Sequence, residues 1–337
     1  MLKAAVIGLG DVSHIHIAAI QANLDIELVA VCDTDETLAR AVSGAKFYTD
    51  YTKMLENEVL DCVHICLPHY LHYSVTKACV EKGIHVFQEK PLALNADEVN
   101  AFIALEAENR HVKIGICFQN RFNETFEKLQ EIVAQGQYGA VKGIKGIVSW
   151  SRSQEYYTIK PWRGQKKLSG GGVIINQAIH TLDQMQLLGG KIASIRGSVS
   201  QLLDYGIEVE DTASAQIRFT SGATGLFFAT NAYVDNSSTE VEVILEQATF
   251  RIKDNILWKI NEDGITERLV EDSRMPGSKF YYGAGHIKLI RKFYQCIQND
   301  SQDYVHVKDA AISIWMIEAI CKSSQIRMEI NLKEKKE

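Results

Sequence analysis

Short apolar runs alternate with amphipathic stretches along the first third of the chain. The apolar runs predict strands at residues 3–9, 27–32, 62–67, 85–88 and 113–118. The stretches between them predict helices at residues 15–23, 50–55, 73–82 and 96–109. Strands that are apolar throughout, each followed by a helix, are typical of a parallel sheet with helices on both faces. We therefore predict an α/β domain at residues 1–119.

The pattern changes at residue 120. A helix is predicted at residues 124–135 and an apolar helix at residues 308–323, with strands at residues 141–150, 192–203, 212–219, 223–229, 239–245 and 256–260. Val241, Val243 and Leu245 alternate with glutamates, which indicates one buried and one exposed face. Residues 120–337 are thus predicted to form an α+β domain on a large, open, mostly antiparallel sheet. Its outer face needs cover, which predicts a homo-oligomer, a dimer or tetramer, formed through this sheet.

Composition narrows the class of protein. The chain has 337 residues, enough for two domains, and no apolar run approaches the length of a membrane helix. The net charge is −6 with acids and bases mixed, so a nucleic-acid partner is not expected. Seven cysteines, an odd number, are scattered along the chain, several of them in apolar runs, which favours reduced thiols. Because the N-terminus passes directly into a strand, we expect a cytoplasmic protein with no membrane partner.

Two glycines follow the first predicted strand and lead into a helix. Gly8 and Gly10 would make a tight turn that lets the backbone approach a pyrophosphate, and Ser13 stands where a third glycine is common. Asp33 ends the second strand, where a carboxylate accepts hydrogen bonds from ribose hydroxyls. No Arg or Lys stands beside Asp33. These residues predict a dinucleotide site for NAD, with NADP less favoured.

Two further strands end in loops that carry polar side chains. Pro68–His72 follows one strand, and Glu89-Lys90-Pro91 follows the next. Ligands of open α/β sheets lie beyond the carboxyl ends of the strands, so both loops are expected to face the cofactor. Lys90 precedes a proline, which holds it out of the helical region and makes it a candidate catalytic cation.

A glycine-rich stretch at residues 170–172 precedes apolar residues at helical spacing. This pattern predicts a helix that starts from flexible backbone. Asn176 and His180 are four residues apart and are expected to project from one side of that helix. An amide and a titratable ring in this position indicate a functional site rather than side chains that pack in the core.

Together these motifs resemble those of the Gfo/Idh/MocA oxidoreductases, named for glucose-fructose oxidoreductase and inositol dehydrogenase. The resemblance covers nearly the whole chain. It rests on the order and spacing of Gly8-Leu9-Gly10, Asp33, Pro68–His72, Glu89-Lys90-Pro91, Arg121, Tyr138–Val141, Trp162–Gly164, Gly170–Asp183, Val209–Thr212, Tyr281–Gly283 and His286.

The resemblance implies a Rossmann domain, an open-sheet domain, and hydride transfer between a nicotinamide and a hydroxyl or carbonyl carbon, usually of a sugar or cyclitol. The family's catalytic set maps to Lys90, Asn176 and His180, and the peptide bond before Pro91 is often cis in relatives. Asn176 departs from the family pattern, because an aspartate commonly stands there. An amide takes no proton but can orient a substrate hydroxyl, and members with asparagine are familiar.

The chemistry assigns a role to each catalytic candidate. Neutral His180 fits the base that oxidation of a secondary alcohol requires, and the positive end of its helix, on whose second turn it is expected, favours the neutral imidazole. Lys90 would then polarise the reacting oxygen. The reverse assignment, with Lys90 as the base, stays open.

The predicted binding residues form two sets. The cofactor set comprises Gly8, Gly10, Asp11, Val12, Asp33, Thr34, Leu67, Pro68, His72, Glu89, Lys90 and Gln119. The substrate set, for a polyhydroxylated small molecule, comprises Arg121, Tyr156, Trp162, Arg163, Asn176, Asp183 and His286. No metal site is expected, since no Cys-x-x-Cys occurs and no ligand set surrounds His14, His16, His64 and His69 in the sequence.

Two alternative functions stay open. A catalytically silent NAD-binding ligand sensor would account for Asn176, but it has no need of Lys90 and His180. A dihydrodiol- or biliverdin-type reductase shares the fold and would be favoured by an apolar pocket.

Overall fold

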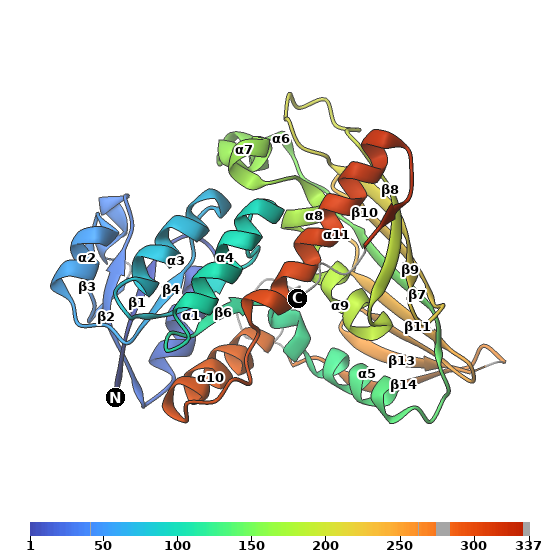
Figure 1. Ribbon diagram of the computed structural model, residues 1–337, viewed down its shortest axis with the longest axis horizontal. Coiled ribbons are helices and arrows are strands. Elements are labelled where there is room, and N and C mark those ends of the chain that lie inside the picture. The colour runs from blue at the N-terminus through green and yellow to red at the C-terminus, as the bar shows by residue number, and fades with distance from the viewer. Residues whose placement is uncertain (41, 262, 274–283, 333–337) are drawn as a thin grey trace. The chain divides into compact units, whose positions relative to one another are not determined.

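The computed structural model of the protein describes residues 1–40, 42–261, 263–273 and 284–332, and Figure 1 shows their secondary structure. The chain divides into two compact units. The first contains Met1–Gln119 and Gly285–Ala311, and the second contains Asn120–Ala284 and Ile312–Glu337. Residues 285–311, which the sequence pattern assigned to the second domain, therefore pack with the first.

The first unit is built on a six-stranded sheet in which every neighbouring pair of strands is parallel. Its order is β3 (Lys46–Tyr48), β2 (Ile26–Cys32), β1 (Leu2–Ile7), β4 (Cys62–Ile65), β5 (His85–Glu89) and β6 (Ile114–Cys117). This order reverses direction between β1 and β4, as in a Rossmann domain. The predicted α/β fold is confirmed, with β3 as an additional short strand.

The helices of the first unit include four that each follow one of its strands and one from later in the chain. They are α1 (Ser13–Gln21), α2 (Tyr51–Asn57), α3 (His72–Val80), α4 (Ala96–Glu108) and α10 (Gly285–Gln298). Side chains cap two of them, because Asp50 accepts from the Thr52 amide and Asn95 from the Glu98 amide. The sequence pattern did not predict α10. Its buried face includes Phe293, whose ring lies so close to β6 that a Cβ added at Gly115 would be 2.6 Å from it.

The second unit is built on a nine-stranded sheet. Its order is β14 (Thr266–Glu271), β13 (Ile256–Ile260), β12 (Thr249–Lys253), β11 (Glu240–Leu245), β7 (Val141–Ser149), β10 (Thr224–Thr230), β9 (Thr212–Phe219), β8 (Ile192–Ser200) and β15 (Ile330–Asn331). The pair β7 and β10 is parallel, and the other pairs are antiparallel. The predicted open, mostly antiparallel sheet is confirmed.

Helices cover one face of this sheet. They include α5 (Glu124–Gln135), α8 (Val173–Asn176), α9 (Ile179–Gly189) and the second-unit part of α11 (Val307–Ile326), and Figure 1 shows α9 lying along the strands. The helix α9 packs so closely on β7 that a Cβ added at Gly146 would lie 2.5 Å from the Met185 sulfur. The opposite face exposes apolar side chains, with Leu226 at 57% and Ile244 at 44%. Within the described residues, no helix is both long and apolar enough to cross a membrane.

The glycine-rich stretch does not form one helix as predicted. It forms α8 and α9, which are separated at Gln177 and Ala178. Both of these residues donate their amide hydrogens to the Val173 carbonyl, so the turn widens and the helical spacing is lost. His180 consequently lies in the first turn of α9 rather than in the second turn of a longer helix, and Asn176 belongs to a different element.

Candidate active site

The turn after β1 has the shape that a pyrophosphate requires. Gly8 has a φ of +90°, and a Cβ added there would lie 2.5 Å from the Cys66 carbonyl oxygen. The next helix, α1, begins after Val12, whose side chain makes no capping hydrogen bond. A glycine that lets the backbone come close and a helix start without a side-chain cap both fit a dinucleotide phosphate.

Asp33 lies against this turn. Its Oδ2 accepts a hydrogen bond from the Leu9 amide at 2.7 Å, and its Oδ1 accepts one from the Asp35 amide at 3.0 Å. These two backbone amides therefore hold the Asp33 carboxylate in place just after the carboxyl end of β2. Thr34, which follows it, is exposed.

The charge of Asp33 is expected to set the preference between the two nicotinamide cofactors. In Asp33→Asn the side-chain oxygen can still accept from Leu9, but the repulsion of a 2′-phosphate is lost. We expect the preference for NAD over NADP to fall by about 10–100-fold, the value of a hydrogen bond to a charged group. Calorimetric titration of both cofactors measures this ratio. Asp35→Asn is the matched control, and an unchanged ratio in Asp33→Asn would contradict the assignment.

His72 joins the two loops that follow β4 and β5. Its Nδ1 lies 2.8 Å from the Pro91 carbonyl oxygen, and its Nε2 lies 2.9 Å from that of Leu67. Burial lowers the pKa of this imidazole. A neutral ring donates from one nitrogen only, so its other nitrogen can accept from the Gln88 amide group at 3.3 Å. In that tautomer His72 donates to the Leu67 carbonyl oxygen, and the Pro91 carbonyl oxygen accepts from Gln88 Nε2 at 3.2 Å.

The other predicted cofactor residues lie at the ends of neighbouring strands. The Lys90–Pro91 peptide is cis, as the resemblance implied, and Lys90 is half-buried. Gln119 is buried and accepts a weak hydrogen bond from the Cys117 thiol. The remaining residues of the predicted cofactor set are exposed or half-buried: Gly10, Asp11, Val12, Leu67 and Pro68. Contact of these residues with a cofactor stays a prediction.

In the second unit, Glu210 holds the start of the glycine-rich stretch. Its Oε1 accepts from the Gly172 amide at 2.8 Å and from the Ile174 amide at 3.2 Å, and its main-chain oxygen accepts from Val173 at 2.9 Å. Burial raises the pKa of the Glu210 carboxyl. The sequence contained a signal for this role, since Glu210 belongs to one of the motifs that carry the resemblance.

Asn176 is fixed by a polar network. Its amide Nδ2 donates to the Tyr156 hydroxyl at 2.9 Å, and Gln177 Nε2 donates to the same hydroxyl at 2.9 Å. Gln177 Oε1 accepts in turn from Asn231 at 3.0 Å. Between residues 171 and 180, Asn176 alone is half-buried, while its neighbours are buried. The network leaves the amide of Asn176 oriented and partly open to solvent.

The predicted aromatic and basic residues near Tyr156 lie together. The Arg163 guanidinium lies 4.1 Å from the centre of the Tyr156 ring and 5.8 Å from that of Trp162. It also donates to the Tyr156 carbonyl oxygen at 3.3 Å. These contacts stabilise the loop that carries Tyr156, so Arg163 supports Asn176 indirectly.

Arg121 and Asp183, both predicted to contact substrate, pair with each other. Arg121 Nε donates to Asp183 Oδ2 at 2.7 Å and its second nitrogen to Oδ1 at 2.6 Å. Asp183 is 1% exposed. This bidentate pair ties the residues before α5 to α9.

The variant Arg121→Lys tests whether Arg121 stabilises the fold or binds the substrate. Lysine keeps the charge but makes no bidentate contact, so we expect a loss of about 1–3 kcal/mol in the free energy of unfolding. Urea denaturation measures this loss. Lys128→Arg on the exposed face of α5 is the control. A large rise in KM with unchanged stability would instead assign Arg121 to the substrate.

Glu89 is the centre of a cluster that the sequence did not reveal. Its Oε1 lies 3.0 Å from His16 Nε2 and 3.6 Å from His286 Nε2, and Cys117 lies beside them. Burial alone would raise the pKa of the Glu89 carboxyl, but the two imidazoles hold it well below its ordinary value. The expectation that no ligand-type residues surround His16 is wrong. His286 contributes to this cluster, and its contact with substrate stays a prediction.

Two segments of the chain match the sequences of one protein family. Residues 2–116 match "Oxidoreductase family, NAD-binding Rossmann fold", and residues 126–251 match "GFO/IDH/MocA C-terminal domain". The chain belongs to the GFO/IDH/MocA oxidoreductase family. Its cofactor is NAD, as the glycine turn and Asp33 predicted.

Relatives within this family align over much of the chain. Myo-inositol 2-dehydrogenase of Thermotoga maritima is 25% identical over 99% of each protein. D-glucoside 3-dehydrogenase of Escherichia coli is 31% identical over 56% of this chain, which is 54% of that relative. The WlbA dehydrogenase from Bordetella pertussis, solved with NADH and UDP-GlcNAcA, has a TM-score of 0.85 and 26% identity, covering 99% of both chains.

Proposed function

We propose that this family member oxidises a hydroxyl-bearing carbon of a sugar, amino sugar or cyclitol, or reduces the matching carbonyl. The named relatives act on or bind inositol, a glucoside or a nucleotide-linked sugar. The observation that carries the proposal is the Asn176 amide, which Tyr156 orients and which is partly open within a buried stretch. An oriented amide is suited to a ligand with hydroxyl groups.

We assign the proton transfer to His180. The imidazole lies in the first turn of α9 and is 9% exposed. The positive end of the helix favours a neutral ring, which can accept the hydroxyl proton. Lys90 stabilises the developing alkoxide, and Asn176 holds a substrate hydroxyl. The bound nicotinamide supplies the hydride acceptor, and Gly8, Gly10 and Asp33 hold the dinucleotide.

A substrate screen tests this function. The purified protein is mixed with NAD and, separately, with inositols, hexoses, amino sugars and sugar phosphates, and NADH formation is followed by its near-ultraviolet absorbance. We expect NADH with at least one of these classes. NADH formation with none of them, in protein shown to bind NAD, would contradict the proposal.

Asn176 favours one second candidate, a silent NAD-binding ligand sensor. In that case sugars would change the affinity for NAD without forming NADH. Calorimetric titration of NAD with and without each sugar, beside the absorbance screen, distinguishes the two functions. The polar network at Asn176 and Tyr156 argues against a reductase with an apolar pocket.

We also propose that the protein is a cytoplasmic homo-oligomer that associates through the exposed face of the nine-stranded sheet. All seven cysteines are unpaired, which suits a reducing compartment. Leu226, Phe228 and Ile244 expose apolar surface on that face, at 57%, 38% and 44%. An isologous contact would bring this face against its own copy.

Leu226→Glu is expected to dissociate the oligomer, because burying an unpaired carboxylate at the contact costs several kcal/mol by desolvation. Size-exclusion chromatography with light scattering measures the mass. Thr266→Glu, an exposed substitution on the edge strand β14, is the control. A monomeric wild-type protein, or an unchanged mass in Leu226→Glu, would contradict this interface.

A further inference from the structure

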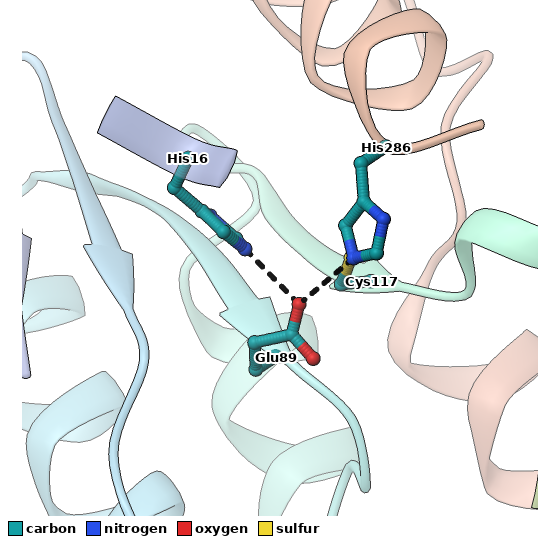
Figure 2. A group of neighbouring side chains, drawn as sticks. All are labelled: His16, Glu89, Cys117 and His286. Carbon is teal, nitrogen blue, oxygen red and sulfur yellow. Dashed lines mark hydrogen bonds and ion pairs between the residues drawn. The ribbon is translucent and has the colours of Figure 1, made fainter. Parts of the chain in front are cut away.

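Four side chains with metal-binding atoms meet in the first unit (Figure 2). His16 comes from α1, Glu89 ends β5, Cys117 ends β6, and His286 comes from α10. All four are buried, with exposures of 0% to 5%. One donor atom from each lies within 4.8 Å of every other. We propose that these residues form a structural Zn²⁺ site.

The donor set and its size fit zinc. Two imidazoles, a thiolate and a carboxylate are the ligands that zinc takes in tetrahedral sites. Bonds of the usual length place neighbouring donors roughly 3.3–3.8 Å apart. The two imidazole nitrogens lie 3.0 and 3.6 Å from the Glu89 oxygen, and the widest separation is 4.8 Å. Side-chain shifts of about an ångström would bring all four donors to one ion.

Charge also favours a cation here. Glu89 is 5% exposed, and the group of residues around it, His16, Cys117 and His286, contains no arginine or lysine. A buried carboxylate without a cation is costly. A zinc ion carries two positive charges, which the carboxylate and the Cys117 thiolate balance. The cluster with bound zinc is therefore neutral as a whole.

A second layer of residues supports His16 as a ligand. His16 Nδ1 lies 2.9 Å from His64 Nδ1, and His64 Nε2 lies 2.8 Å from the Tyr294 hydroxyl. If His16 Nε2 binds the metal, Nδ1 carries the proton and donates to His64, which then donates to Tyr294. Without a metal the same chain can run from Tyr294 to His64 to His16 to Glu89. Both directions use the same number of protons, so the network accommodates metal binding by a change of tautomer.

The zinc ion would stabilise the fold and would take no part in the reaction. Four protein ligands leave no open position, which is the mark of a structural zinc site. The metal would join α10 to the carboxyl ends of β5 and β6. It would also hold Glu89, whose neighbour is Lys90. Glu89 and His286 also belong to the predicted cofactor and substrate sets, but metal content and hydride transfer are measured separately, so either proposal can fail without the other.

Metal content and cobalt spectroscopy test the site. The full chain, without a polyhistidine tag, is purified and its metals are measured by plasma mass spectrometry. We expect about one zinc per chain. After chelation and addition of Co²⁺, we expect visible bands of tetrahedral cobalt and a near-ultraviolet thiolate-to-cobalt band.

Variants locate the ligands. Cys117→Ser should remove the thiolate band, and His286→Ala should lower the zinc content severalfold. Cys79→Ser, which changes another fully buried thiol, and His85→Gln should change neither. If a ligand variant does not fold, the wild-type metal content and cobalt spectrum decide. Wild-type protein with little zinc and no thiolate band would overturn the site, as would a band that persists in Cys117→Ser.

Discussion

His180→Ala and Lys90→Ala are each expected to lower kcat for NADH formation by about 10²–10⁴-fold, the usual contribution of a positioned proton acceptor or a charge-stabilising group. His180 accepts the proton in the proposed reaction, and Lys90 stabilises the charge that the departing proton leaves behind. Since neither group is needed to hold the dinucleotide phosphates, the affinity for NAD should change little. Steady-state kinetics and calorimetric titration measure the two quantities.

Matched variants separate this result from misfolding. His111→Ala and Lys82→Ala remove exposed side chains of the same kinds and should retain full activity. His180→Gln preserves most of the buried volume, so it should match His180→Ala in kcat while melting closer to wild type. Full activity in either alanine variant would refute its assignment. If only Lys90→Ala is inactive, Lys90 is the base.

Gly172→Ala is expected to destabilise the second unit by more than about 3 kcal/mol, above the usual cost of overpacking. A Cβ added there would lie 1.8 Å from the Glu210 carbonyl oxygen. That oxygen accepts from the Val173 amide, so it cannot move without breaking the start of α8. Urea denaturation followed by circular dichroism measures the loss of stability.

The adjacent glycine provides the control for this variant. A Cβ added at Gly171 would lie 3.4 Å from Ile175 and 3.5 Å from the Glu210 carboxylate, which is close to ordinary contact. We expect Gly171→Ala to cost about 1 kcal/mol or less. Equal stability of the two variants would show that the contact with Glu210 does not hold the glycine-rich stretch.

Local signals predicted much of the fold. The helix α5 has the predicted bounds, because Gly136 at a φ of +67° ends it. The strands β9 and β13 also have the predicted bounds, since an alternating run marks β9 and a mainly apolar run marks β13. The parallel sheet of the first unit followed from the alternation of strands with helices.

Contacts between distant residues were not predictable in the same way. The apolar face of α10 is visible in the sequence, but periodicity does not say what it covers, and it packs against α1, β5 and β6. The break at Gln177 depends on Tyr156 and Asn231, which hold its side chain. In the sequence, apolar residues recur at helical spacing on both sides of Gln177, so the sequence alone predicts one helix.

The proposed zinc site was not predicted from the sequence for the same reason. Ligand motifs are recognised by short spacings, whereas His16, Glu89, Cys117 and His286 come from four separate elements. Only the order of strands in the sheet brings the ends of β5 and β6 together. The candidate catalytic residues were found because each stands in a local motif that the family shares.

The proposed function rests on hydride transfer from a hydroxyl-bearing carbon. Its most direct test uses sugars and cyclitols that carry deuterium on carbon, with NAD and wild-type protein, followed by mass spectrometry of the nicotinamide product. We expect wild-type protein to transfer one deuterium to the cofactor and His180→Ala to transfer almost none. An absence of deuterium in the cofactor with every substrate, or equal transfer by the two proteins, would contradict the proposed function.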